Sequence, residues 1–320
     1  MANPAFAVQP RYWVSHEEVQ ERLKDWPKPW IIGGRAIARV TDERTAIFTL
    51  LPRVGIGHSI NLLLPQVGAV EAALLLANLA SLPLDWVARQ KVGGVHLSLY
   101  YLKQLPVIRR GGYGVRDVRY VVGRVVELVY VAWDVKGFAD EVWGEADGAL
   151  REVLVRRWRE SWEAMGGEPK GWEAPEWLEY YGAKAGEGFP FPPFPWNPER
   201  RAQIQAELDA YYAYLYGLSR KQLRYILDPA DLTKRELESL GDPVEEVGDA
   251  LVGYEERRQS DFPGETFRVL REKERKRWGE YRTRRLVLEA WERLVGGGEG
   301  MQVQEGAGER SEPARGEQRA

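Results

Sequence analysis

The sequence predicts an α+β chain, with a mixed α/β part followed by a mainly helical part. Residues 30–64 alternate apolar and polar side chains in short runs rich in Ile, Val and Thr, and this period of two is typical of strands. Beyond residue 110, apolar side chains recur at steps of three and four residues, which indicates amphipathic helices. We therefore expect a mixed α/β unit over residues 1–110 and a helical extension over residues 111–295.

The mixed unit is expected to begin with short strands and hairpins. Breaks between the alternating runs are predicted at glycine and proline, namely at Gly33, Gly34, Pro52, Gly55 and Gly57. A helix over residues 68–90 follows, because its apolar positions have helical spacing. Its apolar run, residues 72–84, is shorter than the roughly 20 residues that a membrane helix needs. We expect a buried helix with no membrane contact, and then a strand over residues 95–105.

The helical extension is predicted to contain two long loops and to be followed by a tail. Helices are expected over residues 121–134, 147–162, 198–218, 219–226 and 267–294. Residues 163–196 are rich in Trp, Gly and Pro, which excludes a regular helix and predicts a loop. Residues 229–262 are acidic and are predicted to form a second loop. Residues 296–320 have almost no apolar side chains, so we expect a disordered tail.

Composition excludes several kinds of site. The chain has 320 residues, enough to bury a core, and no cysteine, so disulfides and thiolate metal sites are excluded. Its histidines, His16, His58 and His96, lack the spacing of metal ligands, and we expect no metal site. Without a secretion signal, the chain is expected to be cytoplasmic.

Charge is unevenly distributed along the chain. The formal net charge is −3, yet residues 1–130 hold 16 Lys and Arg against 10 Asp and Glu, and the remainder holds 29 against 38. Lys and Arg contacts to backbone phosphates provide most non-specific affinity for DNA, so this asymmetry fits a DNA-facing first half. The alternative is a chance scatter of surface charge.

Residues 86–107 are the most informative segment. They read WVARQKVGGVHLSLYYLKQLPV, which combines a helix end, a basic glycine turn and an apolar strand closed by proline. This segment resembles the turn that ends the target recognition domain of DNA adenine methyltransferases of the type IIG restriction-modification class. Similar turns occur in the specificity subunits of type I enzymes. Further blocks that resemble that family, in the family's order, are residues 11–14, 35–45, 51–52, 128–134, 207–218 and 280–284.

The resemblance implies a target recognition domain and its helical extension, without the catalytic domain. The only Pro-Pro pair, at residues 192–193, follows Phe191, which has no acceptor for the amino group of a target base. The Gly-Ile-Gly at residues 55–57 is too short for a nucleotide-binding turn. We therefore predict no catalytic and no cofactor-binding residue. The implied partners are double-stranded DNA and a separate catalytic chain that binds S-adenosylmethionine.

The glycine turn supplies one group of predicted DNA contacts. They are Arg89, Gln90, Lys91, Gly93, Gly94 and His96. Glycines would let backbone N–H groups approach a phosphate without obstruction by a Cβ, and such contacts position a duplex but carry little sequence information. The alternative is a helix C-cap, in which the cations complement the helix dipole and glycine ends the helix. The two interpretations are compatible, and the histidine could simply be structural.

Three arginines supply the second group of predicted contacts. Arg35, Arg39 and Arg44 lie in a predicted strand–turn–strand. Arg35 and Arg39 would share one face of an extended strand, so both could meet the same groove or the same acidic partner. Arginine and glutamine are the side chains expected to read guanine and adenine, but the sequence does not say which of them does so.

Three other clusters are expected to be structural. The tyrosines at 211, 212, 214 and 216 fall on several faces of one helix, which favours core packing over a single stacking platform. The Pro-aromatic segment 189–196 would lie across the helices or dock onto the catalytic chain. The charge run 271–277 would be a solvated helix face with internal ion pairs.

The predicted function is therefore sequence recognition for an adenine-N6 DNA methyltransferase in a restriction-modification or phage-defence system. Two alternatives stay open. The chain could be a non-functional remnant of a truncated methyltransferase gene, or a helical protein-interaction module without DNA affinity. Binding to duplex DNA at several salt concentrations would separate the last of these from the first.

Overall fold

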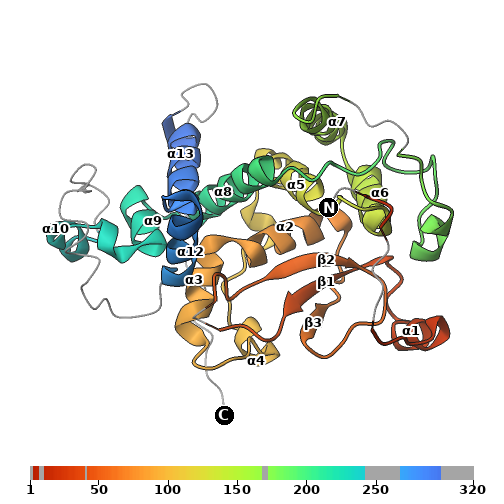
Figure 1. Ribbon diagram of the computed structural model, residues 1–320, viewed down its shortest axis with the longest axis horizontal. Coiled ribbons are helices and arrows are strands. Elements are labelled where there is room, and N and C mark those ends of the chain that lie inside the picture. Colours follow the sequence, from red (N-terminus) through yellow and green to blue (C-terminus); the bar gives the residue numbers. More distant parts are fainter. Residues whose placement is uncertain (1–2, 7–10, 40–41, 168–171, 242–266, 297–320) are drawn as a thin grey trace, which may run out of the picture.

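The computed structural model describes residues 3–6, 11–39, 42–167, 172–241 and 267–296. Within these residues the chain is mainly helical and has one small antiparallel sheet (Figure 1), which confirms the α+β class. Residues 242–262 of the expected acidic loop and residues 297–320 of the expected tail lie outside the described residues.

The sheet has three antiparallel strands in the order β2-β1-β3. These are β1 Trp30–Arg35, β2 Phe48–Pro52 and β3 Ile60–Leu63, preceded by α1 His16–Arg22. Gly33 and Gly34 were expected to break a strand, but both lie inside β1. A Cβ on Gly33 would overlap Leu51, and one on Gly34 would overlap Phe48. The two glycines therefore let side chains of β2 lie across the central strand, which is a role for glycine within sheets.

The helix predicted over residues 68–90 is two helices. They are α2 Ala69–Ala80 and α3 Leu82–Lys91, and they are bent by 58° at the break. Ser81 between them has extended backbone, and Pro83 lies in the first turn of α3, where its missing N–H costs no helical hydrogen bond. Among the described helices, none alone is long and apolar enough to cross a membrane; this bent pair meets that test only when its two helices are joined.

The strand predicted over residues 95–105 is wrong. The chain pairs with residues 36–38 only around His96, which forms an isolated antiparallel bridge with Ile37. Residues Leu99–Leu102 form the short helix α4 instead. A short apolar run fits either a strand or a helix, and here the side chains of the second half of α4 pack on the core.

A group of helices packs on α2 and around the sheet (Figure 1). Its members are η1 Arg110–Gly112, α5 Val115–Val129, η2 Trp133–Val135, α6 Lys136–Glu145, α7 Gly148–Glu163 and η3 Glu176–Tyr181. α5 begins before the predicted residue 121, because Asp117 accepts the Gly114 N–H at 2.7 Å and so caps its first turn. One core cluster contains buried side chains from Trp26 to Tyr212. The expected domain boundary at residues 110/111 therefore runs through a single core.

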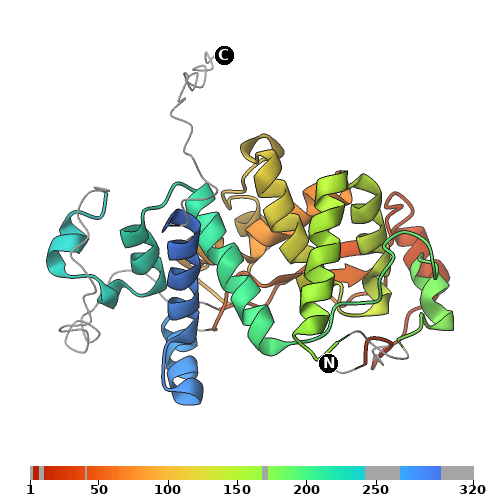
Figure 2. The same cartoon turned by 90° about the horizontal axis from the view of Figure 1, so that it is seen from above.

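The carboxy-terminal helices form a second core with Leu82 of α3. They are α8 Pro198–Leu215, α9 Arg220–Leu227, η4 Pro229–Asp231, α10 Lys234–Glu238, α12 Arg268–Trp278 and α13 Arg282–Gly296. α8 and α13 lie side by side, as Figure 2 shows. Gly279 has a φ of +78°, which breaks the helix predicted over residues 267–294 into α12 and α13. Residues 229–238, expected to be a loop, form two short helices.

The charge run 271–277 is not the solvated face that was predicted. Arg271 and Glu274 are buried on its inner side. Arg271 donates to Asp228 at 2.7 Å, and Glu274 accepts the backbone N–H and the hydroxyl of Thr283 at 2.7 and 2.6 Å. Two of the charges in this run therefore fix α12 to neighbouring elements.

The Pro-aromatic segment lies across the helices, as one of its two interpretations predicts. Phe189 and Phe194 are buried in the first core, and the Phe194 N–H donates to Tyr130 O at 2.8 Å. Phe191 stacks on Trp158 with ring centroids 4.4 Å apart. These contacts give the Phe-Pro-Pro-Phe sequence a packing role.

The tyrosines of α8 are mostly structural, as predicted. Tyr211 and Tyr212 are buried, and their hydroxyls donate to Asp117 at 2.6 Å and to Leu74 O at 2.8 Å. Tyr214 is 38% exposed.

Candidate functional site

Pairing of two distant loops brings several predicted DNA contacts together. The Leu97 N–H donates to Ala36 O at 2.9 Å, and the Ala38 N–H donates to Val95 O at 3.0 Å. This pairing holds the segment after β1 against the glycine turn after α3. Exposed or partly exposed side chains of both segments therefore occupy one edge of the molecule. We call Arg35, Arg39, Gln90, Lys91 and His96 the basic edge.

Local interactions order the backbone of the basic edge. The Arg39 N–H donates to the Asp42 carboxylate at 3.3 Å, and the Thr45 hydroxyl donates to Arg39 O at 3.1 Å. The Arg35 guanidinium lies 3.5 Å from the same carboxylate. Asp42 therefore both closes the turn and lowers the positive charge at one end of the basic edge. β1 ends at Arg35, so Arg35 and Arg39 do not share one strand face as predicted.

Gly93 and Gly94 contribute no special backbone conformation. Neither has a positive φ, and a Cβ added to either would meet nothing within 4 Å. α3 ends at Lys91, and its C-cap, Val92, has extended backbone with its N–H bonded to Ala88 O. The prediction that a glycine ends this helix is therefore wrong. The glycine turn is open to solvent, so its backbone stays accessible to a partner.

Arg89 does not belong to the basic edge, and its assignment as a DNA contact is corrected. Its side chain is fully buried and donates to the carbonyl oxygens of Asp42 and Glu43 at 2.7 and 2.8 Å. Its guanidinium lies over the Phe267 ring, 4.4 Å from the centroid, and 3.8 Å from Asp85. The residue thus fixes the loop before β2 to α3 and to the start of α12.

Arg44 is also corrected from a DNA contact to a structural residue. Its guanidinium donates to Asp209 of α8 at 2.8 Å and lies 3.9 Å from Asp85. Asp85 in turn accepts the N–H groups of Thr45 and Ala46, each at 2.9 Å. Burial raises the pKa of Asp85, and Arg44 and Arg89 oppose that change. We call Arg44, Arg89, Asp85 and Asp209 the buried charge cluster.

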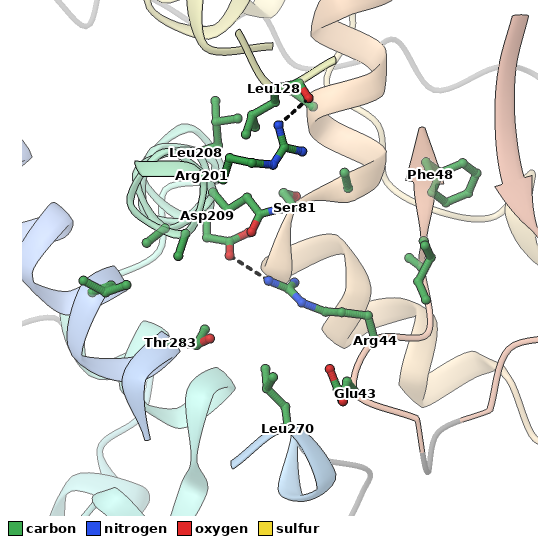
Figure 3. A pocket seen from close by; sticks show the side chains of 18 of the residues that line it. Glu43, Arg44, Phe48, Ser81, Leu128, Arg201, Leu208, Asp209, Leu270 and Thr283 are labelled. Carbon is green, nitrogen blue, oxygen red and sulfur yellow. Dashed lines mark hydrogen bonds and ion pairs between the residues drawn. The ribbon is translucent and has the colours of Figure 1, made fainter. Parts of the chain in front are cut away.

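A cavity of about 430 Å³ lies beside the buried charge cluster, and Figure 3 shows part of its wall. Side chains of β2 and the loop before it, α2, α5, α8, α12 and α13 line it. Arg44 and Asp209 face one another on one side, and Arg201 lies near Leu128 on another. The sequence analysis missed this cavity, because its polar residues are separated by more than 150 positions and form no local motif.

Neither a metal centre nor a known relative guides the assignment. Among the described residues, no group of three or more His, Asp or Glu side chains could hold a metal ion. Comparisons with family models, with curated proteins and with solved structures gave no match to this chain. The functional argument therefore depends on the basic edge, the cavity and the resemblance of the sequence blocks.

Proposed function

We propose that this chain is the DNA-recognition portion of an adenine-N6 DNA methyltransferase, in a cytoplasmic restriction-modification or phage-defence system. A separate catalytic chain would bind S-adenosylmethionine and transfer the methyl group. The observation that supports the proposal is the pairing of residues 36–38 with residues 95–97, because it gathers cations from two sequence blocks that resemble the family. Cations gathered on one exposed edge suit the phosphate backbone of a duplex.

The residues of the basic edge would have different tasks. Arg39 and Lys91 are cations with no ion pair to a described residue, so they are the proposed phosphate contacts. The exposed backbone at Gly93 and Gly94 would approach the same phosphates. Gln90 and His96 carry hydrogen-bonding groups that suit base edges. Arg35 shares its charge with Asp42 and would contribute less.

The two alternatives differ from this proposal in what they expect of DNA. A protein-interaction module would have no salt-dependent affinity for a duplex. A remnant of a truncated gene would keep the basic edge but act with no catalytic chain. The exposed cations of the basic edge favour the DNA-recognition proposal over the interaction module.

Binding of the full chain to a random-sequence duplex pool tests the proposal. Affinity should fall steeply between about 50 and 200 mM salt, because released counterions drive phosphate contacts. Rounds of selection from the pool should then enrich one sequence. Binding that is independent of salt, or that enriches no sequence with or without the methyltransferase encoded beside this chain, would contradict the proposal.

A further inference from the structure

The cavity beside the buried charge cluster lies between the two cores of the molecule. Its apolar wall belongs to α2 and α5 of the first core, and consists of Leu76, Ala77, Val125, Leu128 and Val129. The opposite wall comes from α12 and α13 and contains Leu270 and Leu286. The exposed side chains of Gln205 and Trp278 also line it, so it opens to solvent. Its volume of about 430 Å³ is within the range of small-molecule sites.

Most charged groups that line the cavity have a partner. Arg44 is bonded to Asp209 at 2.8 Å. Glu43 is paired with Lys273 at 2.6 Å. In separate contacts, the Arg282 guanidinium is paired with Glu199, and the Glu274 carboxylate accepts two hydrogen bonds from Thr283. These groups form the charged part of the wall without needing a ligand.

Arg201 differs from the other charged groups of the wall. Among the described residues, no carboxylate lies within ion-pair distance of its guanidinium. It donates to Leu128 O at 2.8 Å and lies over the Trp196 ring, 3.9 Å from the centroid. Burial lowers the pKa of Arg201 to about 10, and the charge of Glu127 only partly offsets this. A partly desolvated cation without a counter-ion is costly, so an anion beside it would be stabilising.

We propose that the cavity binds a small organic anion, with its carboxylate, sulfonate or phosphate group at Arg201 and its flat apolar body against α2 and α5. The guanidinium keeps donors beyond the one used by Leu128, and a planar fork suits an oxyanion. The Leu and Val side chains of the wall would bury the apolar body. Such a ligand would contact both cores at once. This inference is independent of the proposed DNA recognition.

The competing explanation is that Arg201 only completes the end of a helix. Leu128 belongs to the last turn of α5, and an arginine there complements the helix dipole. That role needs the donor but no ligand. The two explanations therefore differ in what the cavity binds, and a charge-specific probe separates them.

Titration calorimetry of the full chain with naphthalene-1-sulfonate and with the neutral naphthalene-1-sulfonamide tests the proposal. The sulfonate should bind about tenfold tighter or more, because a hydrogen bond to a charged group contributes more than one to a neutral group. Arg201→Gln should remove that difference. Arg159→Gln, which removes an exposed cation of α7 outside the cavity, should leave it unchanged.

A second variant locates the bound probe if Arg201→Gln does not fold. Gln205→Trp keeps Arg201 but fills the solvent side of the cavity, so it should abolish binding of both compounds. Equal affinity for the two compounds, no saturable binding of the sulfonate, or unchanged binding by Gln205→Trp would each overturn the proposal.

Discussion

The basic edge and the buried charge cluster use the same residue type for opposite purposes. Arg39 is exposed at the end of a loop pairing, whereas Arg89 has a fully buried side chain. Both come from sequence blocks that resemble a DNA-recognition domain. The difference is made by residues far away in the sequence, since Asp209 and Phe267 cover Arg44 and Arg89. An arginine in a basic motif is therefore a surface cation only if no distant element covers it.

The largest expected difference between the two regions is in stability. Arg89→Ala should lower the free energy of unfolding by about 3–5 kcal/mol, because it leaves a buried carboxylate with less compensation and two carbonyl groups without their donor. Arg39→Ala should change it by less than about 0.5 kcal/mol. Urea unfolding followed by circular dichroism measures both. Equal losses would mean that the two arginines are not in different environments.

A double-mutant cycle sharpens the comparison within the buried charge cluster. Arg44→Met and Asp209→Leu should each destabilise the protein, and the double variant should recover about 1–3 kcal/mol of their summed loss. The recovery is expected because each single change leaves the other charge without its nearest partner. Additive losses in urea unfolding would show that this ion pair does not couple α8 to the loop before β2.

DNA affinity provides a smaller effect with the opposite pattern. Arg39→Ala and Lys91→Ala should each reduce the slope of log affinity against log salt by about 0.9, the share of one phosphate contact. Arg159→Ala is the matched control, because it removes an exposed cation from α7. Fluorescence anisotropy at four salt concentrations gives the slopes. If the control lowers the slope as much as the other two variants, the basic edge is not a specific contact surface.

The smallest effect is expected at the glycine turn. Gly94→Val should change the free energy of unfolding by less than about 0.5 kcal/mol, because its φ is not positive and its Cβ would meet no atom. The same substitution at Gly182, where φ is +73°, should cost about 1–2 kcal/mol or more. Thermal melts of the two variants test this contrast. A large loss for Gly94→Val would restore a conformational role for the glycine turn.

Helix boundaries were predictable where a local signal marks them. α7 begins after Asp147, which accepts the Leu150 N–H, and α9 begins after Ser219, which forms a capping box with Gln222. Both starts agree with the sequence analysis to within one residue. The break at Gly279 was missed, because helical periodicity continues on both sides of it.

The candidate sites were predictable only in part, because their contacts are non-local. The sequence identified the cations of the basic edge, but the pairing that gathers them joins segments about 60 residues apart. No local pattern indicates that Asp209 pairs with Arg44, or that Arg201 lines a cavity with Val125. Burial of a polar side chain depends on which elements meet, and one sequence does not contain that information in any window.

The link from Arg89 to Phe267 has a consequence for how this chain can be divided. The loop that precedes β2 is covered by residues from α8 and α12, so the first 110 residues do not carry all the partners of their own buried charges. During synthesis, these arginines emerge long before Phe267 leaves the ribosome, and their final environment forms late. Exchange of the first 110 residues between related chains would therefore transfer recognition only together with the counterparts of Asp209 and Phe267.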